Sequence, residues 1–546
     1  MPDPARLPLP HLPASRAPSM TASARGAARG AAKGEDGASE MPLALCAAIL
    51  LLFAFAIRAP VFGNPVVSVD ETFYLLVGDR ILHGALPFAD LWDRKPVGLF
   101  LIYAAIRLLG GEGVLQYQVV ATLFAAATAG MIAVVAATFA TRAGAVCAGL
   151  VYLTFLGAFE GVGGQSPVFY NLFVVLAAWV TLRARGRPPG ARLALGCGAM
   201  LLAGMAIQTK YTAVFEGMFL GCVLLWQGWR AGTRPAMLVA QGAAWIACGL
   251  LPTAAALAFY VLRGQGEAFL YANFLSVFER STYSEGSVLT RLGPIVLLLL
   301  PLLLVAALSR WPGRLMRPGG GQDAMAAQDF VTAWSLAALA GFLAFGTYYT
   351  HYALPLLLPL SAMAAPAFGA WRQTGLKLGR GARAPRVPVA LLLGLFGLVA
   401  SFVLVTKHVR QRGDGTEIRR IVSFIRPRLE GCLYVFDGEP MLYHLTGSCI
   451  PTRYAFPSHL SDQKEAGAIG VDQVAEIHRI FATHPGIVVT WEGMQPRNSA
   501  DSVAAVEDEL SRHYRKVLEV PVGRHTRQIY QRRPDDEAPQ AGTGPR

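Results

Sequence analysis

The sequence predicts an α-helical protein that crosses a membrane many times and carries a small α/β domain near its C-terminal end. Of its 546 residues, 54% are hydrophobic and 15% are charged, whereas a soluble domain carries roughly 25% charged residues. The mean hydropathy is +0.42. Apolar runs long enough to cross a bilayer recur between residues 42 and 406, and the sequence then becomes polar.

The first element is a tail over residues 1–40, which is rich in Ala, Arg, Gly and Pro. Such a segment buries too little apolar surface to fold, so we expect it to be disordered. The first apolar run, near 42–62, is long enough to span, and no small-residue cleavage site follows it. We therefore expect a membrane span there and no cleaved signal peptide.

About eleven runs meet the requirement of some 20 mostly apolar residues. They lie near 42–62, 117–140, 143–160, 167–184, 191–207, 211–228, 236–262, 291–309, 328–346, 350–370 and 387–406. The apolar run 95–111 has only about 14 residues between Lys95 and Gly110, a length that favours an interfacial helix over a span.

The net charge of +13 reflects membrane topology, and we expect no nucleic-acid partner. The basic residues cluster in short loops between apolar runs, and these loops share one side with the basic tail if 95–111 does not span. The positive-inside rule assigns that side to the cytoplasm. We expect a multi-pass protein of the cell inner (plasma) membrane, with the loop after the first span and everything after residue 406 on the extracytoplasmic side.

Residues 407–533 are predicted to form the small α/β domain, followed by a disordered tail at 534–546. We expect helices at 415–429, 472–484 and 502–520, and strands at 432–438, 486–492 and 526–533. Cys432 and Cys449 lie in this domain. An oxidising location makes a disulfide between them as good an interpretation as two separate buried thiols.

Charged residues concentrate in the loop after the first span, in "VDETFY" (69–74) and "WDRKP" (92–96). Ser68 and Glu71 have capping-box spacing, which predicts an amphipathic helix on the membrane surface. Capping explains only Glu71. A carboxylate at the water–lipid boundary suits a general base, and a lysine suits a phosphate oxygen, so Asp70, Asp93 and Lys95 predict a catalytic site.

These two motifs and "GTYYTHYALPLLLPLSAMAA" (346–365) resemble GT-C fold glycosyltransferases, specifically the protein O-mannosyltransferase and aminoarabinose transferase superfamily. The resemblance covers the span layout over 42–406. It implies a GT-C transmembrane domain at 41–406, with 63–116 as an external catalytic loop that contains interfacial helices. It also implies a polyprenyl-phosphate-linked sugar as donor and transfer outside the cytoplasm.

The resemblance assigns roles residue by residue. Asp70 matches the catalytic carboxylate and Glu71 its supporting neighbour. Lys95 matches a lysine near the donor phosphate, and Asp93 an acidic residue that helps to bind a metal or the acceptor. The need for a divalent metal ion stays open. Phe73 stands where the aminoarabinose branch commonly has a basic residue, which does not favour lipid A as acceptor.

Three further residues are candidates for substrate binding. Lys210 is either a snorkelling lysine at a helix end or a second phosphate contact. His351 is a candidate donor to a phosphate oxygen, and Tyr349 beside it also fits an aromatic belt. The loop 263–290, which contains Arg280, is a candidate lid. Individual sugar contacts are not favoured for Glu160, Gln165 and Asn171.

The expected function is a membrane glycosyltransferase with Asp70 as general base and a cell-envelope glycan, lipid or protein as acceptor. A nucleotide-driven enzyme is not expected, because no phosphate-binding GxxxxGK[ST] or GxGxxG motif with the right flanks is present. A secondary transporter is the alternative, although the halves of the chain show no similarity to each other. A non-catalytic scaffold is the third hypothesis.

Overall fold

Long apolar helices make up most of the computed structural model, which describes residues 41–281, 285–310, 321–379 and 386–534. The predicted tail 1–40 and residues 535–546 of the predicted tail 534–546 lie outside the described residues. The contacts reported below lie within Ala44–Arg546, which forms one unit.

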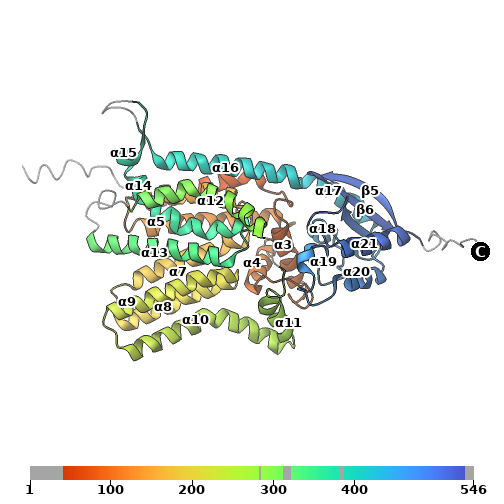
Figure 1. Ribbon diagram of the computed structural model, residues 1–546, viewed down its shortest axis with the longest axis horizontal. Coiled ribbons are helices and arrows are strands. Elements are labelled where there is room, and N and C mark those ends of the chain that lie inside the picture. Colours follow the sequence, from red (N-terminus) through yellow and green to blue (C-terminus); the bar gives the residue numbers. More distant parts are fainter. Residues whose placement is uncertain (1–40, 282–284, 311–320, 380–385, 535–546) are drawn as a thin grey trace, which may run out of the picture. The chain divides into compact units, whose positions relative to one another are not determined.

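Ten segments in the described residues are long and apolar enough to cross a membrane. Their helices are α2 (Leu43–Arg58), α5 (Val114–Ala136), α6 (Arg142–Leu156), α7 (Ser166–Ala184), α8 (Pro189–Ile207), α10 (Pro235–Leu262), α12 (Glu285–Leu308), α13 (Gly321–Phe345), α14 (Leu357–Gly369) and α16 (Val389–Arg412). The remaining predicted span, 211–228, corresponds to α9 (Val214–Arg230), which has 17 residues and follows a 3-10 turn. The protein is therefore a multi-pass membrane protein, as predicted (Figure 1).

Two helices of the loop after α2 do not span. Helix α4 (Val97–Arg107) has 11 residues, about 16 Å of helix against a hydrocarbon core of about 30 Å. Helix α3 (Val69–Leu82) is buried without interruption from Glu71 to Asp79, so the prediction of an amphipathic surface helix is wrong. Gly78 allows its close approach to α4, because a Cβ there would lie 2.7 Å from backbone atoms of α4.

The predicted capping box at the start of α3 is also wrong. Ser68 occupies the N-cap position, but within the described chain its side chain makes no capping hydrogen bond. Its hydroxyl accepts a hydrogen bond from Gln165 at 3.0 Å instead. The Glu71 side chain is fully buried and does not return to the Ser68 amide. Tertiary contacts therefore replace the local contacts that the spacing indicated.

The C-terminal region contains a mixed four-stranded sheet in the order β3-β4-β6-β5. Strands β3 (Leu433–Val435) and β4 (Ile487–Trp491) are parallel. Strand β6 (His525–Arg532) is antiparallel both to β4 and to β5 (Tyr514–Val522). The helices around it are α17 (Gly415–Ile425), α18 (Met441–Thr446), α19 (Ser458–Ser461), α20 (Gln473–Ala482) and α21 (Ala500–His513). The predicted α/β fold of this region is confirmed.

The predicted helix 502–520 is wrong beyond His513. The chain continues as β5 (Tyr514–Val522), which pairs with β6 (His525–Arg532) through a turn at Gly523, whose φ is 62°. The hairpin partner decides the structure here, because local helical periodicity does not include it. The remaining short α-helices and strands of the described residues are α11 (Gly266–Leu270), α15 (Trp371–Thr374), β1 (Leu376–Lys377) and β2 (Arg386–Val387).

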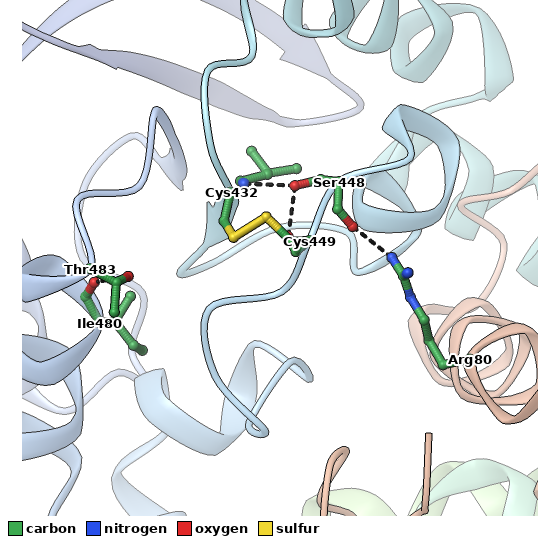
Figure 2. The surroundings of a disulfide bond; sticks show 7 residues. Arg80, Cys432, Ser448, Cys449, Ile480 and Thr483 are labelled. Carbon is green, nitrogen blue, oxygen red and sulfur yellow. Dashed lines mark hydrogen bonds between the residues drawn. A yellow bond between two sulfur atoms is a disulfide. The ribbon is translucent and has the colours of Figure 1, made fainter. Parts of the chain in front are cut away.

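The C-terminal region also contains the Cys432–Cys449 disulfide, with the two Cα atoms 4.8 Å apart (Figure 2). The sequence left open a disulfide or two separate buried thiols, and the structure has the disulfide. The neighbouring Ser448 accepts a hydrogen bond from the Arg80 guanidinium through its carbonyl at 2.6 Å. The disulfide therefore lies next to a contact between this region and α3.

The C-terminal region packs directly on the loop that carries the charged motifs. The Trp92 amide donates to the Arg453 carbonyl at 2.8 Å. The Phe73 and Phe456 rings meet edge to face with centroids 5.1 Å apart, and the Trp92 ring lies 4.7 Å from that of His459. In Figure 1, α3 accordingly lies beside α18. These contacts bring residues far apart in sequence around one site.

Candidate active site

The turn before α4 holds Lys95 against Asp93. The Asp93 carboxylate accepts a hydrogen bond from the Lys95 amide at 2.8 Å and lies 3.9 Å from the Lys95 ammonium. Burial lowers the pKa of Lys95, but the charges of Asp93 and Asp70 outweigh it and leave that pKa above its ordinary value. Lys95 is therefore a fixed positive charge between two carboxylates.

Asp70 lies in the first turn of α3, surrounded by positive or protonatable groups. One carboxylate oxygen accepts a hydrogen bond from the Gln165 amide at 3.2 Å. Burial raises the pKa of Asp70, but Lys95, His351, the Gln165 amide and Lys210 together hold it below its ordinary value. Asp70 is consequently ionised at neutral pH and able to accept a proton.

Lys210 comes from the connection between α8 and α9. It is only 6% exposed, so the snorkelling interpretation does not hold. Its ammonium lies 3.7 Å from the centroid of the Tyr352 ring. Burial and the charge of Lys95 lower the pKa of Lys210 well below its ordinary value, while Asp70 opposes them. An anion placed between the two lysines would raise the pKa of Lys210.

His351 and Tyr349 lie at the start of the helical segment that leads into α14. The His351 Nδ1 lies 3.4 Å from a carboxylate oxygen of Glu160, and the Tyr349 and His351 rings stack with centroids 5.9 Å apart. Since Asp70 also interacts with His351, this residue reaches the same charge cluster. The structure thus brings Asp70, Lys95, Lys210 and His351 together.

Glu71 lies in different surroundings from its neighbour. Its carboxylate has no hydrogen bond of ordinary geometry among the described residues. Burial raises its pKa to about 7, although the Gly164 backbone and Arg58 lower it. The carboxylate lies directly against the backbone of Gly163, because a Cβ added to this glycine would be 2.0 Å from a carboxylate oxygen. These surroundings therefore fit a structural role for Glu71 better than a role as the base.

The sequence interpretation undervalued Gln165 and Glu160, which contact Asp70 and His351 respectively. They are the first and last residues of "EGVGGQ" (160–165), in the loop between α6 and α7. The signal that was available is the run of glycines, which permits close backbone approach beside polar residues. The third residue of that group, Asn171, contacts Tyr152 and the Leu354 carbonyl instead.

The described residues do not fit a metal ion held by the protein. Nowhere in the described ranges do three His, Cys, Asp or Glu side chains gather in a way that could ligate one. Asp93, which the resemblance linked to a metal or the acceptor, already binds the Lys95 amide and lies near its ammonium. We therefore assign no step to a metal.

Several solved structures have the same arrangement of helices. ArnT from Cupriavidus metallidurans in the apo state aligns with a TM-score of 0.60 at 16% identity, over 89% of this chain and 97% of that one. Its complex with undecaprenyl phosphate gives a TM-score of 0.57 at 14% identity, over the same shares. This protein has the GT-C fold.

An archaeal enzyme has a similar fold. The oligosaccharyltransferase of Archaeoglobus fulgidus in the apo form aligns with a TM-score of 0.52 at 11% identity, over 89% of this chain and 81% of that one. No protein-family model matches the chain, and no curated protein matches it at a significant level. The arrangement of helices therefore supports the GT-C likeness that the three sequence motifs indicated.

Proposed function

We propose that this protein transfers a sugar from a polyprenyl-phosphate-linked donor to an extracytoplasmic acceptor, namely a cell-envelope glycan, lipid or protein. The observation that carries the proposal is the half-buried Asp70, whose pKa is held below its ordinary value beside Lys95, Lys210 and His351. A carboxylate and several cations match a reaction that removes a proton at one point and expels a phosphate at another. The undecaprenyl phosphate complex of ArnT supports this type of donor.

In the proposed reaction, Asp70 accepts the proton of an acceptor hydroxyl or amine. The acceptor atom attacks the anomeric carbon, the bond from that carbon to the phosphate oxygen breaks, and its electron pair leaves with the phosphate. Lys95, Lys210 and His351 bind the departing phosphate. Removing one such electrostatic contact typically costs about 3–4 kcal/mol in the barrier. The family resemblance implies inversion at the anomeric carbon.

Donor binding also strengthens the base. In the free protein, Lys95, His351 and Lys210 lower the pKa of Asp70. A bound phosphate neutralises these cations, so the pKa of Asp70 rises and the carboxylate becomes a better proton acceptor. The base is thus strongest when the donor is in place. Tyr349 stacks on His351 and has the proposed role of fixing its orientation at the phosphate.

The proposed location follows from the loop charges. The reaction site and the C-terminal region face the extracytoplasmic side of the inner (plasma) membrane, where the lipid-linked donor is presented. This placement is supported by the basic residues of the opposite loops. An enzyme that takes its sugar from a lipid phosphate needs no nucleotide site, in agreement with the motifs of the sequence.

The test is sugar transfer by the purified protein in lipid nanodiscs, with a panel of radiolabelled polyprenyl-phospho-pentoses and hexoses and an extract of cell-envelope acceptors. We expect label to move to the acceptor fraction and polyprenyl phosphate to accumulate. Solute flux in proteoliposomes without sugar transfer would establish a transporter. If the protein shows neither sugar transfer nor solute flux, the scaffold hypothesis would remain. Mass spectrometry of the envelope glycans of a strain that lacks the gene then identifies the acceptor.

A further inference from the structure

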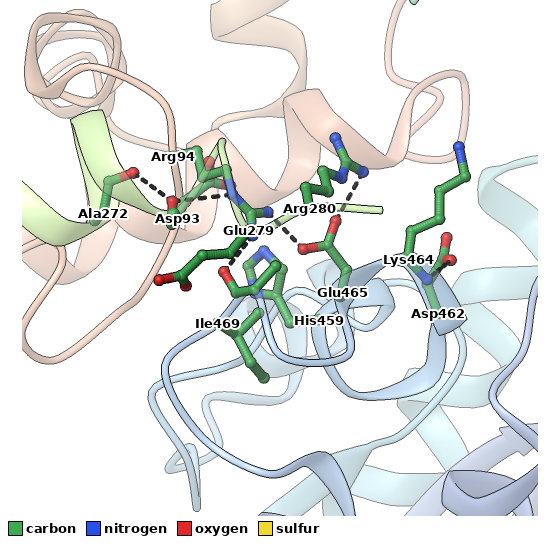
Figure 3. Close-up of polar contacts among 12 residues, drawn as sticks. Asp93, Arg94, Ala272, Glu279, Arg280, His459, Asp462, Lys464, Glu465 and Ile469 are labelled. Carbon is green, nitrogen blue, oxygen red and sulfur yellow. Dashed lines mark hydrogen bonds and ion pairs between the residues drawn. The ribbon is translucent and has the colours of Figure 1, made fainter. Parts of the chain in front are cut away.

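A buried glutamate of the C-terminal region binds two arginines that come from two segments bordering the site (Figure 3). Glu465 lies in a single 3-10 turn, Gln463–Glu465, and its side chain is 3% exposed. One carboxylate oxygen lies 2.5 Å from the Arg94 guanidinium, and the other lies 2.7 Å from that of Arg280. We name Glu465, Arg94 and Arg280 the Glu465 triad.

Arg94 connects the triad to the catalytic turn, because it stands between Asp93 and Lys95 in the chain. Its guanidinium also donates to the Ser276 hydroxyl at 3.1 Å and to the Ala468 carbonyl at 2.5 Å. It lies over the Trp92 ring, 4.7 Å from its centroid. An arginine held on so many sides fixes the backbone on which the two charged neighbours stand.

Arg280 connects the triad to the segment after α10. This segment continues α11 as the π-helical turn Tyr271–Leu275. Burial lowers the pKa of Arg280, but Glu465, together with smaller contributions from nearby tyrosines and Asp462, raises that pKa above its ordinary value. The charge of Arg280 also lowers the pKa of Lys95. Glu465 therefore binds Arg94, which is adjacent to Lys95 in the sequence. It also binds Arg280, whose charge acts on Lys95 through space.

We propose that Glu465 is a positioning residue of the active site. It fixes the turn that presents Asp93 and Lys95 to the donor, and it holds the Arg280 segment beside that turn. Loss of its charge leaves two arginines without their common counter-ion, and they repel each other and Lys95. The C-terminal region is in this account a wall of the active site. The kinetic part of this inference rests on the proposed function.

The positional part is tested without activity, by amide hydrogen exchange on the Glu465→Gln variant in nanodiscs. The Trp92 and Lys95 amides are hydrogen bonded to Arg453 and Asp93, so they report on the turn. Loss of a buried charge partner is expected to speed exchange over residues 92–96 by about 10-fold or more. Unchanged exchange at 92–96 overturns the proposal.

A matched control separates positioning from general loss of stability. Glu439 is another buried glutamate of the same region, and it pairs with Arg527 inside it. The Glu439→Gln variant removes a buried charge partner but no contact of the Glu465 triad. We expect it to leave exchange at 92–96 unchanged. An equal increase in both variants would show that Glu465 only stabilises its own region, and this result overturns the proposal.

The kinetic part is read as a split between KM and kcat. Displacement of Lys95 from the donor phosphate is expected to raise the donor KM of Glu465→Gln by about 10-fold, with a smaller change in kcat. The conservative Glu465→Asp variant should recover part of the loss, and Glu439→Gln should not change KM. A donor KM of Glu465→Gln equal to that of the control overturns the proposal. If the native protein transfers no sugar, the proposed function fails, whereas the exchange experiment still decides whether Glu465 positions the turn.

Discussion

Asp70 and Glu71 are neighbours on α3, yet their carboxyl groups meet opposite surroundings. Asp70 faces cations that keep it ionised, whereas Glu71 is buried against the 160–165 loop with its pKa raised to about 7. Two adjacent carboxyls with separated pKa values can take separate tasks. The pair was recognisable in the sequence, but the division of roles between its members depends on contacts with other helices.

Replacement of Asp70 by Asn tests its role as base. The change keeps the shape of the side chain and removes its ability to accept a proton, so kcat should fall about 10³-fold, within the range of general-base catalysis. The measurement is transfer of label from the lipid-linked donor. Asp90→Asn is the matched control, because Asp90 is exposed on the same loop. Near-native turnover by Asp70→Asn would remove the assignment.

Replacement of Glu71 by Gln tests whether ionisation of this buried carboxyl group destabilises the protein. Its folded pKa of about 7 lies above the unfolded value of 4.5, so the unfolded state binds fewer protons between these pH values and stability falls as the pH rises. Glu71→Gln avoids this loss. It should be stabilised relative to the native protein by up to about 3 kcal/mol at pH 8 and by little at pH 4. The measurement is thermal unfolding in detergent across this pH range, and a difference that does not grow with pH contradicts the prediction.

At the scale of elements, the long spans were predictable because twenty apolar residues have few alternatives in a membrane protein. Helix α4 was also correctly predicted as too short to span. The failures lie where a partner decides the structure. Residues 514–520 have helical periodicity but pair with β6, and Ser68 has capping spacing but its hydroxyl binds Gln165.

The loop between α6 and α7 supports the acidic pair through its backbone. Arg58 of α2 donates to the Gly163 carbonyl at 2.7 Å, and the Tyr103 hydroxyl of α4 donates to the Gly164 carbonyl at 2.8 Å. Side chains at these two glycines would collide with Glu71 and with Tyr103. Glycine is needed here for space, which explains why the loop can lie directly against α3 and α4.

Gly163→Ala should therefore displace α3 and lower both stability and transfer. Its methyl group would meet the Glu71 carboxylate at 2.0 Å, and crowding of a packed interior costs about 1–3 kcal/mol. Gly130→Ala is the control, since a Cβ at Gly130 of α5 has no atom within 4 Å in the described structure. The melting temperature and turnover of both variants are compared. A Gly163→Ala protein as stable and active as the control would contradict the prediction, because it would show that the 160–165 loop can shift to accommodate the methyl group.

At the scale of the whole molecule, the site is made by contacts that no local pattern contains. Gln165 and Asp70 are 95 residues apart, and Arg94 and Glu465 are 371 residues apart. The sequence pointed to Asp70, Lys95, Lys210 and His351 through motifs. It assigned no site role to the C-terminal region, because that role depends on packing against the turn before α4.

The proposed reaction requires one orientation of the whole chain, and cysteine labelling in intact cells tests it. In a variant with the five cysteines outside the disulfide replaced by Ala, new cysteines are placed at exposed positions: Asp90 beside the site, Glu492 in the C-terminal region and Arg187 between α7 and α8. A maleimide that does not cross membranes should label Asp90→Cys and Glu492→Cys in intact cells, and Arg187→Cys only after permeabilisation. Basic loops stay in the cytoplasm, which gives this order. The reverse order would place Asp70 on the cytoplasmic side, where the proposed donor is not presented, and would exclude the proposed reaction.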